Sequence, residues 1–219
     1  MINTVQVVDS INRELINELL NEYHSGSLVE NNHMNKVLPR EETVNLVAEI
    51  VEPIINRKLS RGYHGGNFYK HVWSYDLHTD YKTWIDNTLN VVIPLEFVEP
   101  QASLVIFDQV WELDSITWSM NRPVPYLTFN TGVKGCPYEY PVKNLTGQDI
   151  AEEFHRTHLS RFPKECCFGL SGEAYLFQPG SMIIFDNRRI HCTSNLPDTL
   201  DPWKIGQKTG LSLRYKVLD

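Results

Sequence analysis

The residues best suited to chemistry are two histidines, one aspartate and one arginine that are spread along the chain. His78 and Asp80 are separated by one residue, and His191 follows an apolar segment much later. Side chains on a β-strand alternate between its two faces, so residues i and i+2 point the same way. An imidazole and a carboxylate can therefore project together from a strand end, while His191 offers a third ligand from elsewhere in the chain.

Two histidines and one carboxylate on one face of a metal ion form the facial triad of non-heme Fe(II) oxygenases, whose opposite face stays open. Arg214 lies in a final segment, Leu211 to Val217, in which apolar and polar residues alternate. A polar face on a strand inside a barrel needs a reason, and a guanidinium grips a carboxylate through two parallel hydrogen bonds. The neighbouring hydroxyl of Ser212 could donate to the same carboxylate.

The elements that must position these residues are predominantly strands. Segments rich in β-branched and aromatic residues, bounded by turn residues, predict strands at about 68–77, 88–97, 103–111, 173–178, 181–186, 189–193 and 209–218. Many short strands at this spacing are typical of a β-sandwich or barrel.

Two helices are expected before the strands, within residues 1–60. Asp9 or Ser10 can cap the first, the second begins near Glu41, and Pro53 should kink the second or end its regular part. Residues 31–39 are expected to form the loop between them. Both helices carry an apolar stripe that predicts packing against the outside of a sheet.

A long insertion at about 112–172 interrupts the strands, and it includes a predicted helix at 147–162. Insertions of this length are usually functional or lid-like, so it is a candidate cover for the site; shielding of a sheet edge is an equally good interpretation. His155 and His158 share one face of the predicted helix, and a solvated face is the preferred interpretation for them. The whole chain, 1–219, is expected to be one domain, with the core at 65–219.

The order of His78, Asp80, His191 and finally Arg214 resembles that of the Fe(II)/2-oxoglutarate-dependent dioxygenase superfamily. The resemblance implies a mainly β fold with flanking helices, the double-stranded β-helix or jelly roll. It implies that His78, Asp80 and His191 bind Fe(II), that Arg214 holds the distal carboxylate of the co-substrate 2-oxoglutarate, and that dioxygen is consumed. The implied reaction is hydroxylation of a small molecule or short side chain, since the resembling halogenases lack the carboxylate that Asp80 supplies. Desaturation and ring closure stay open.

Asn90 is an unusual amide within an apolar strand. It could bind the 2-oxoglutarate carboxylate or orient a ligand, or it could bond to backbone at a bulge. Two rival functions keep the same fold. A cupin-like metal enzyme would not need 2-oxoglutarate, and a non-catalytic jelly-roll binding module would need neither metal nor turnover.

Composition narrows the possible partners. The chain has 219 residues, of which 42% are hydrophobic and 21% charged, as in an ordinary globular domain. Its net charge of −7 argues against a broad basic surface for nucleic acid or for a membrane. The N-terminus lacks the features of a secretory signal. The cysteines Cys136, Cys166, Cys167 and Cys192 show no zinc-type spacing, so free thiols in a cytoplasmic setting are expected.

Overall fold

The structure is a computed structural model that describes eleven segments of the chain. They are 4–27, 29–31, 34–61, 65–71, 77–79, 87–97, 103–111, 142–143, 145–162, 164–194 and 208–218. Asp80 and about half of the predicted insertion, residues 112–141, lie outside this part of the chain.

Two antiparallel sheets form the body of the molecule. The strands of the larger sheet, in spatial order, are β1 (Gln6–Val8), β10 (Met182–Asp186), β6 (Thr88–Phe97), β12 (Lys208–Leu218), β5 (Gly66–His71), β3 (Met34–Val37) and β2 (Val29–Asn31), and β4 (Lys58–Leu59) pairs with the end of β12. The smaller sheet is built on β7 (Ser103–Trp111), which pairs with β11 (Arg189–Thr193), β8 (Val142–Lys143) and β9 (Gly172–Leu176).

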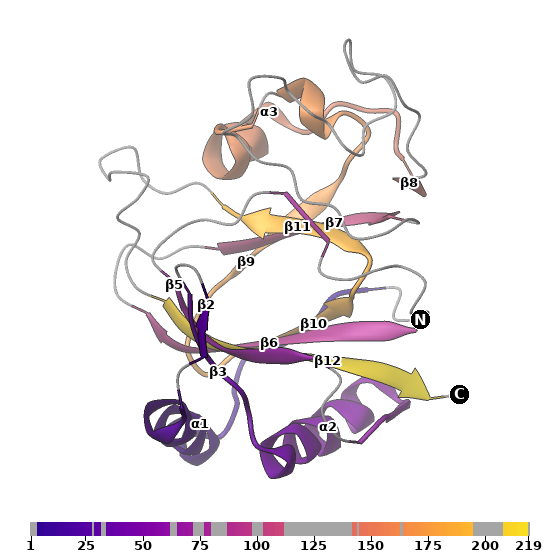
Figure 1. Ribbon diagram of the computed structural model, residues 1–219. Coiled ribbons are helices and arrows are strands. Elements are labelled where there is room, and N and C mark those ends of the chain that lie inside the picture. Colours follow the sequence, from indigo (N-terminus) through magenta and orange to yellow (C-terminus); the bar gives the residue numbers. More distant parts are fainter. Residues whose placement is uncertain are drawn as a thin grey trace.

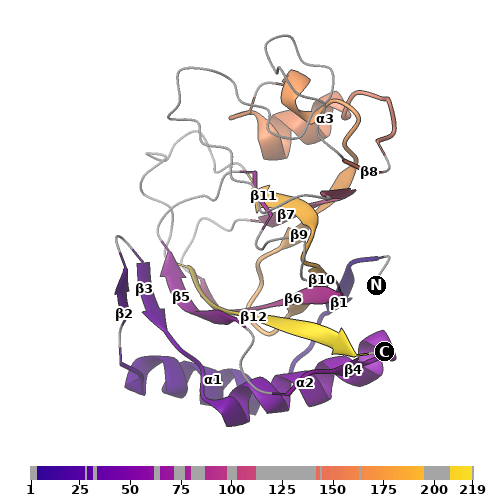
Figure 2. The same cartoon turned by 45° about the vertical axis from the view of Figure 1, so that its right-hand side comes forward.

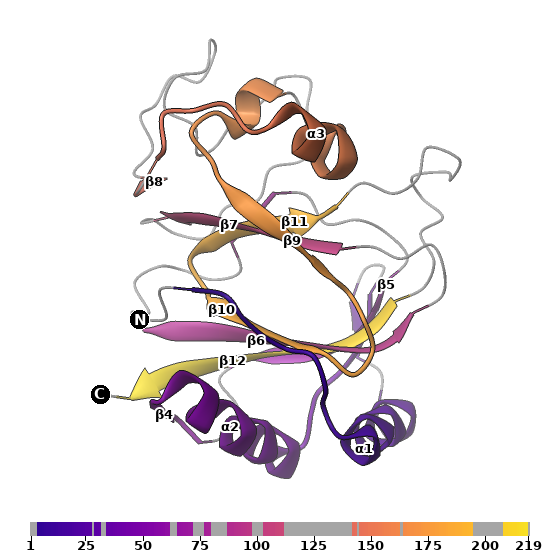
Figure 3. The same ribbon diagram turned by 180° about the vertical axis from the view of Figure 1, so that it is seen from behind.

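The two sheets face each other as the halves of a jelly roll, which confirms the predicted fold class (Figure 1). Consecutive strands alternate between the sheets after β9: β10 belongs to the larger sheet, β11 to the smaller, and β12 returns to the larger. Seen from behind, the smaller sheet lies above the larger one, with β1 running along β10 (Figure 3).

Helices α1 (Arg13–Ser25) and α2 (Glu41–Ile55) cover the outer face of the larger sheet, as predicted (Figure 2). The predicted cap was wrong: Asn12 caps α1, because its side-chain oxygen accepts a hydrogen bond from the backbone N–H of Glu14 at 2.9 Å. Helix α2 continues past Pro53 to Ile55 and ends at Asn56, whose left-handed conformation closes it.

The interval 31–39 is not simply a loop. Val29–Asn31 and Met34–Val37 form a hairpin that extends the edge of the larger sheet, so the N-terminal region adds strands as well as helices. The helix predicted at 147–162 is also shorter than expected. Its regular part comprises α3 (Glu152–Phe154) and one π-helical segment (His155–Leu159), and a 3₁₀ turn (Lys164–Cys167) follows.

Strand β12 shows how the sequence pattern becomes two faces. Its apolar residues join the core shared with α1 and α2, and the phenol of Tyr215 donates to the backbone carbonyl of Val44 at 2.7 Å. These residues are Leu211, Leu213, Tyr215 and Val217. Lys208, Ser212 and Arg214 have the opposite phase, so they face the space between the sheets.

Among the described residues, no helix has the length and apolar character required to cross a membrane.

Gly66 should be intolerant of any side chain, because it lies where β5 meets β12. Its φ is +110°, and a Cβ there would overlap the backbone carbonyl of Ser212. We expect Gly66→Ala to lower the free energy of unfolding by about 3 kcal/mol, measured by urea denaturation. Gly180→Ala is the matched control, since Gly180 also has a positive φ (+90°) but open space around it. Equal losses in the two variants would contradict the close packing of β5 against β12.

Candidate metal centre

The centre of the candidate site is a reciprocal pair of backbone hydrogen bonds between His78 and His191. The N–H of each residue donates to the carbonyl of the other, and both distances are 2.9 Å. Directly opposed residues of an antiparallel pair project their side chains to the same face. The ring centroids accordingly lie 4.2 Å apart at an interplanar angle of 52°.

The ring of His191 is fixed by a hydrogen bond that also sets its tautomer. Its Nδ1 lies 2.9 Å from the backbone carbonyl oxygen of Arg189, and because a carbonyl can only accept, Nδ1 carries the proton. The lone pair of the neutral ring is then on Nε2, the arrangement that second-sphere carbonyls impose on metal-binding histidines. His191 is 4% exposed, so this orientation is held within the barrel.

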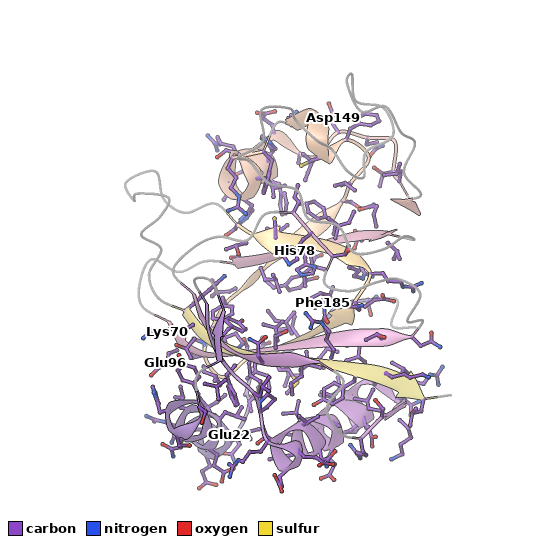
Figure 4. All side chains as sticks on the ribbon, viewed as in Figure 1. Glu22, Lys70, His78, Glu96, Asp149 and Phe185 are labelled. Carbon is purple, nitrogen blue, oxygen red and sulfur yellow. The ribbon has the colours of Figure 1, made fainter. Side chains whose placement is uncertain are left out.

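Phe185 links the histidine pair to the larger sheet. Its ring contacts that of His191 edge-on, with centroids 5.0 Å apart and an interplanar angle of 68°. Figure 4 labels two residues of this region, with His78 beside the smaller sheet and Phe185 rising from the larger one. The site therefore lies between the two sheets, where the rings of His78 and His191 are side by side.

The third predicted ligand, Asp80, lies outside the described residues. Within the described part of the chain, no group of three metal-binding side chains occurs. The structure thus brings together His78 and His191, and the carboxylate of the triad stays a prediction from sequence.

Asn90 and Arg214 share one cross-strand row with Phe185. The register pairs Phe185 with Asn90, and Asn90 with Arg214, on the three central strands of the larger sheet. Asn90 is fully buried, and its side chain is out of phase with Leu89 and Val91, which pack toward the helices. Ser212 lies on the same inner face one step along β12. Core packing therefore places all three polar residues on the face opposite to the helices, and their roles stay predictions.

Sequence reasoning missed Lys208, the first residue of β12, six residues before Arg214. Its Nζ donates to the hydroxyl of Thr193 at 3.2 Å and lies 5.4 Å from the ring centre of Phe177. Thr193 is two residues after His191 and faces the same way, because Ile190 and Cys192 pack in the core on the other side of the smaller sheet. The predicted strand began one residue too late, at 209, and so excluded this lysine.

The surroundings of Lys208 are unfavourable to its positive charge. The residue is buried, and a second cation lies near it: the guanidinium of Arg161 donates to the backbone carbonyl of Thr193 at 2.7 Å. The pKa of Lys208 is lowered to about 8, mainly by burial and further by the positive charge of Arg161. A bound anion at this point would relieve both effects.

Two other sequence predictions concern residues near the site. Cys192 is fully buried in the core beneath the insertion, which confirms that it points away from the histidines. His155 contacts the backbone carbonyl of Phe162 at 2.9 Å, and His158 packs against the ring of Phe154. The solvated helix face predicted for them is therefore wrong in part, because both rings pack within their own segment.

Comparisons with known proteins agree on the fold. No protein-family profile matches the sequence, and no curated protein matches it significantly. HygX from Streptomyces hygroscopicus, crystallised with nickel, 2-oxoglutarate and hygromycin B, superposes with a TM-score of 0.51 at 12% identity over 97% of this chain and 82% of HygX. EctD from S. alaskensis gives a TM-score of 0.53 at 10% identity over 97% of this chain and 72% of EctD. At such identities the likeness shows the shared fold alone.

The cost of burying Lys208 should be measurable as a pH-dependent stability. An unfolded lysine has a pKa near 10.5, so between about pH 8 and 10.5 the unfolded chain binds more protons than the folded one, and stability rises with pH. We expect Lys208→Met to raise the free energy of unfolding by roughly 2 kcal/mol at pH 7, and less at pH 9.5. Denaturant melts at both pH values test this.

Lys216→Met is the matched control, because Lys216 lies on the same strand but is exposed. A stability difference between wild type and Lys208→Met that stays constant from pH 7 to 9.5 would show that Lys208 is not buried in its charged form.

Proposed function

We propose that this chain is an Fe(II)- and 2-oxoglutarate-dependent oxygenase that hydroxylates a small molecule or a short side chain. The observation that carries the proposal is the paired placement of His78 and His191, with their rings 4.2 Å apart between the sheets of a jelly roll. The structures of HygX and of EctD, which share this fold, include crystals with bound 2-oxoglutarate. That likeness supports the proposal without carrying it.

The donor set fits a non-heme iron ion. His78 and His191 would bind through imidazole nitrogens, and Asp80, two residues after His78, would supply the carboxylate of a facial triad. The Nδ1–H of His191 is already engaged by the carbonyl of Arg189, so the ring can present Nε2 without rotating. Iron and 2-oxoglutarate, when bound, supply the oxidising chemistry that protein side chains lack.

The co-substrate carboxylate has two candidate anchors on β12, and the contacts of Lys208 favour it over the sequence-based choice, Arg214. Lys208 contacts Thr193, which is only two residues from His191 on the same face of the same strand. Side chains at i and i+2 are about 7 Å apart, a span that a five-carbon diacid can bridge while its other end chelates the metal. The hydroxyl of Thr193 and the charge of Lys208 would then both meet the distal carboxylate.

The remaining walls of the space between the sheets keep water out. Residues from both sheets contribute buried apolar side chains to one cluster: Tyr69, Val92, Ile106, Phe177, Ile183 and Phe185. Exclusion of water strengthens the attraction between a buried lysine and a carboxylate, and it protects a reactive centre from side reactions. The protein's own part in the reaction is thus to bind and orient the metal and the co-substrate and to enclose them.

The decisive experiment is an anaerobic titration of the Fe(II)-loaded protein with 2-oxoglutarate, followed through the visible charge-transfer absorption of the chelate. We expect a saturable band in the wild type and its loss in His191→Ala. Lys208→Met should weaken 2-oxoglutarate binding by about 10- to 100-fold, the effect of losing one charge-assisted hydrogen bond. Arg214→Gln should change the dissociation constant by less than about threefold.

A larger loss of 2-oxoglutarate affinity in Arg214→Gln than in Lys208→Met would identify Arg214 as the anchor. Binding of iron without any band would favour the cupin-like enzyme, and absence of iron binding would leave a jelly-roll binding module.

Replacement of Lys208 by arginine provides a pH test of the same anchor. Because the pKa of Lys208 is about 8 in the absence of ligand, the affinity for 2-oxoglutarate should fall as the pH rises above 8. The guanidinium of the Lys208→Arg variant would keep its charge, so this fall should be absent there. Titration with 2-oxoglutarate at pH 7 and pH 9 measures the affinity of the wild type and of Lys208→Arg. An equal loss of affinity in the two proteins would rule out deprotonation of Lys208 as the cause.

A further inference from the structure

The end of the inner face that lies beyond Phe185 is polar. Counting along the strands, the row of Phe185, Asn90 and Arg214 is followed by a row that contains Asn187 and Thr88, and the backbone N–H of Asn187 donates to the carbonyl of Thr88 at 3.1 Å. On the other side of Phe185 the same face is apolar, with Ile183 and Val92. The inner face of the larger sheet therefore changes from apolar to polar at the level where the ring of Phe185 meets His191.

Arg214 is held close to the backbone of Gly65. Its N–H donates to the carbonyl of Gly65 at 3.0 Å, and a Cβ on Gly65 would lie 3.5 Å from Nη1 and 3.6 Å from Cδ of Arg214. Gly65 has a φ of +137°, a conformation that other residues rarely adopt. The arginine side chain therefore runs along the backbone of Gly65, and it is half-buried.

Asn187 is the second observation at this end of the barrel. It is fully buried in the turn between β10 and β11, and neither the oxygen nor the nitrogen of its side-chain amide has a hydrogen-bond partner among the described residues. A buried amide without partners costs about 1–3 kcal/mol, so such groups usually await a ligand or an ordered water. By strand alternation, Asn187 shares the face of Phe185, because Asp186 lies in phase with Ile184 and packs toward the other side.

The charge on this face contrasts with that of the chain. The protein carries a net charge of −7, yet none of the described inner-face residues of β6, β10 and β12 is acidic. Asp186, at the end of β10, faces the other way and is paired with Arg188 at 2.9 Å. Glu96 of β6 lies toward α1, where its charge adds to the effect of burial in raising the pKa of Tyr23. An inner face with this composition favours anions over cations.

Resting on the function proposed above, we infer that the substrate carries an anionic group, a carboxylate or a phosphate, which Arg214, level with Phe185, binds together with the amide of Asn187 in the row that follows. A planar guanidinium presents two parallel donors to either group. Lys208 and Arg214 are six residues apart on β12, roughly 20 Å along the strand, so one small diacid at Lys208 does not occupy both. The two cations would hold two different anions, one beside Thr193 and the other at the level of Phe185.

The test compares an acid with the amide of the same carbon skeleton, because only the acid carries a negative charge. Binding of phenylacetate, phenylacetamide and phenyl phosphate to the Fe(II)- and 2-oxoglutarate-loaded protein is measured anaerobically by calorimetry. We expect at least one of the two acids to bind about tenfold or more tightly than the amide. This preference should vanish in Arg214→Gln, persist in part in Arg214→Lys, and remain in Arg13→Gln, which removes an exposed charge from α1 on the outer side of the larger sheet.

The comparison of phenylacetate with phenyl phosphate distinguishes a carboxylate site from a phosphate site. Equal binding of acids and amide by the wild type, or an unchanged preference in Arg214→Gln, would overturn the inference. So would an Arg214→Gln variant that loses 2-oxoglutarate affinity but keeps the preference for acids. Because calorimetry does not depend on the charge-transfer band, a missing band together with an Arg214-dependent preference would reject the proposed oxygenase and retain the anion site.

Discussion

The reciprocal hydrogen bonds between His78 and His191 determine where everything else in the site must be. They join two segments that are far apart in sequence, and they force both imidazoles onto the face of the smaller sheet that looks at the larger one. Strand β7 supports this pair from the other side, because His191 is registered opposite Ile106 at its centre. His191 is therefore held on a strand ladder, and an isolated bridge ties His78 to it, so the backbone fixes the separation of the two rings.

Strand β12 serves stability and binding through its alternation. One face supplies four large apolar residues to the core beneath α1 and α2, where the phenol of Tyr215 is bonded to α2. The other face carries Lys208, Ser212 and Arg214 into the interior. The strand cannot shift by one residue without exchanging these faces, so the packing of the helices also fixes the register of the binding residues. This explains how helices remote from the histidines can still govern the site.

Much of this arrangement could be predicted from the sequence, because it depends on local periodicity. The alternating pattern of β12 and the apolar run of β10 defined their strands to within about one residue. The jelly roll was implied by the family resemblance that the order of His78, Asp80, His191 and Arg214 carries. The hairpin at Val29–Val37 was missed because its short strands acquire their pairing from the edge of the sheet and not from their own composition. Lys208 was missed because its burial comes from Thr193 and Phe177, which only the folded chain brings to it.

The choice of lysine at position 208 has a thermodynamic consequence that an arginine would not have. A buried guanidinium stays charged at any physiological pH, whereas an ammonium with a pKa of about 8 can lose its proton when no anion is present. The empty barrel can thus limit the destabilisation that a buried charge would cause, and arrival of a dicarboxylate would restore the proton together with the ion pair. Arg214 faces a different situation, since it is half-buried and lies against glycine backbone. The two cations on one strand therefore differ in burial as well as in position, in the way expected if the deep one serves an enclosed co-substrate and the outer one a substrate that enters and leaves.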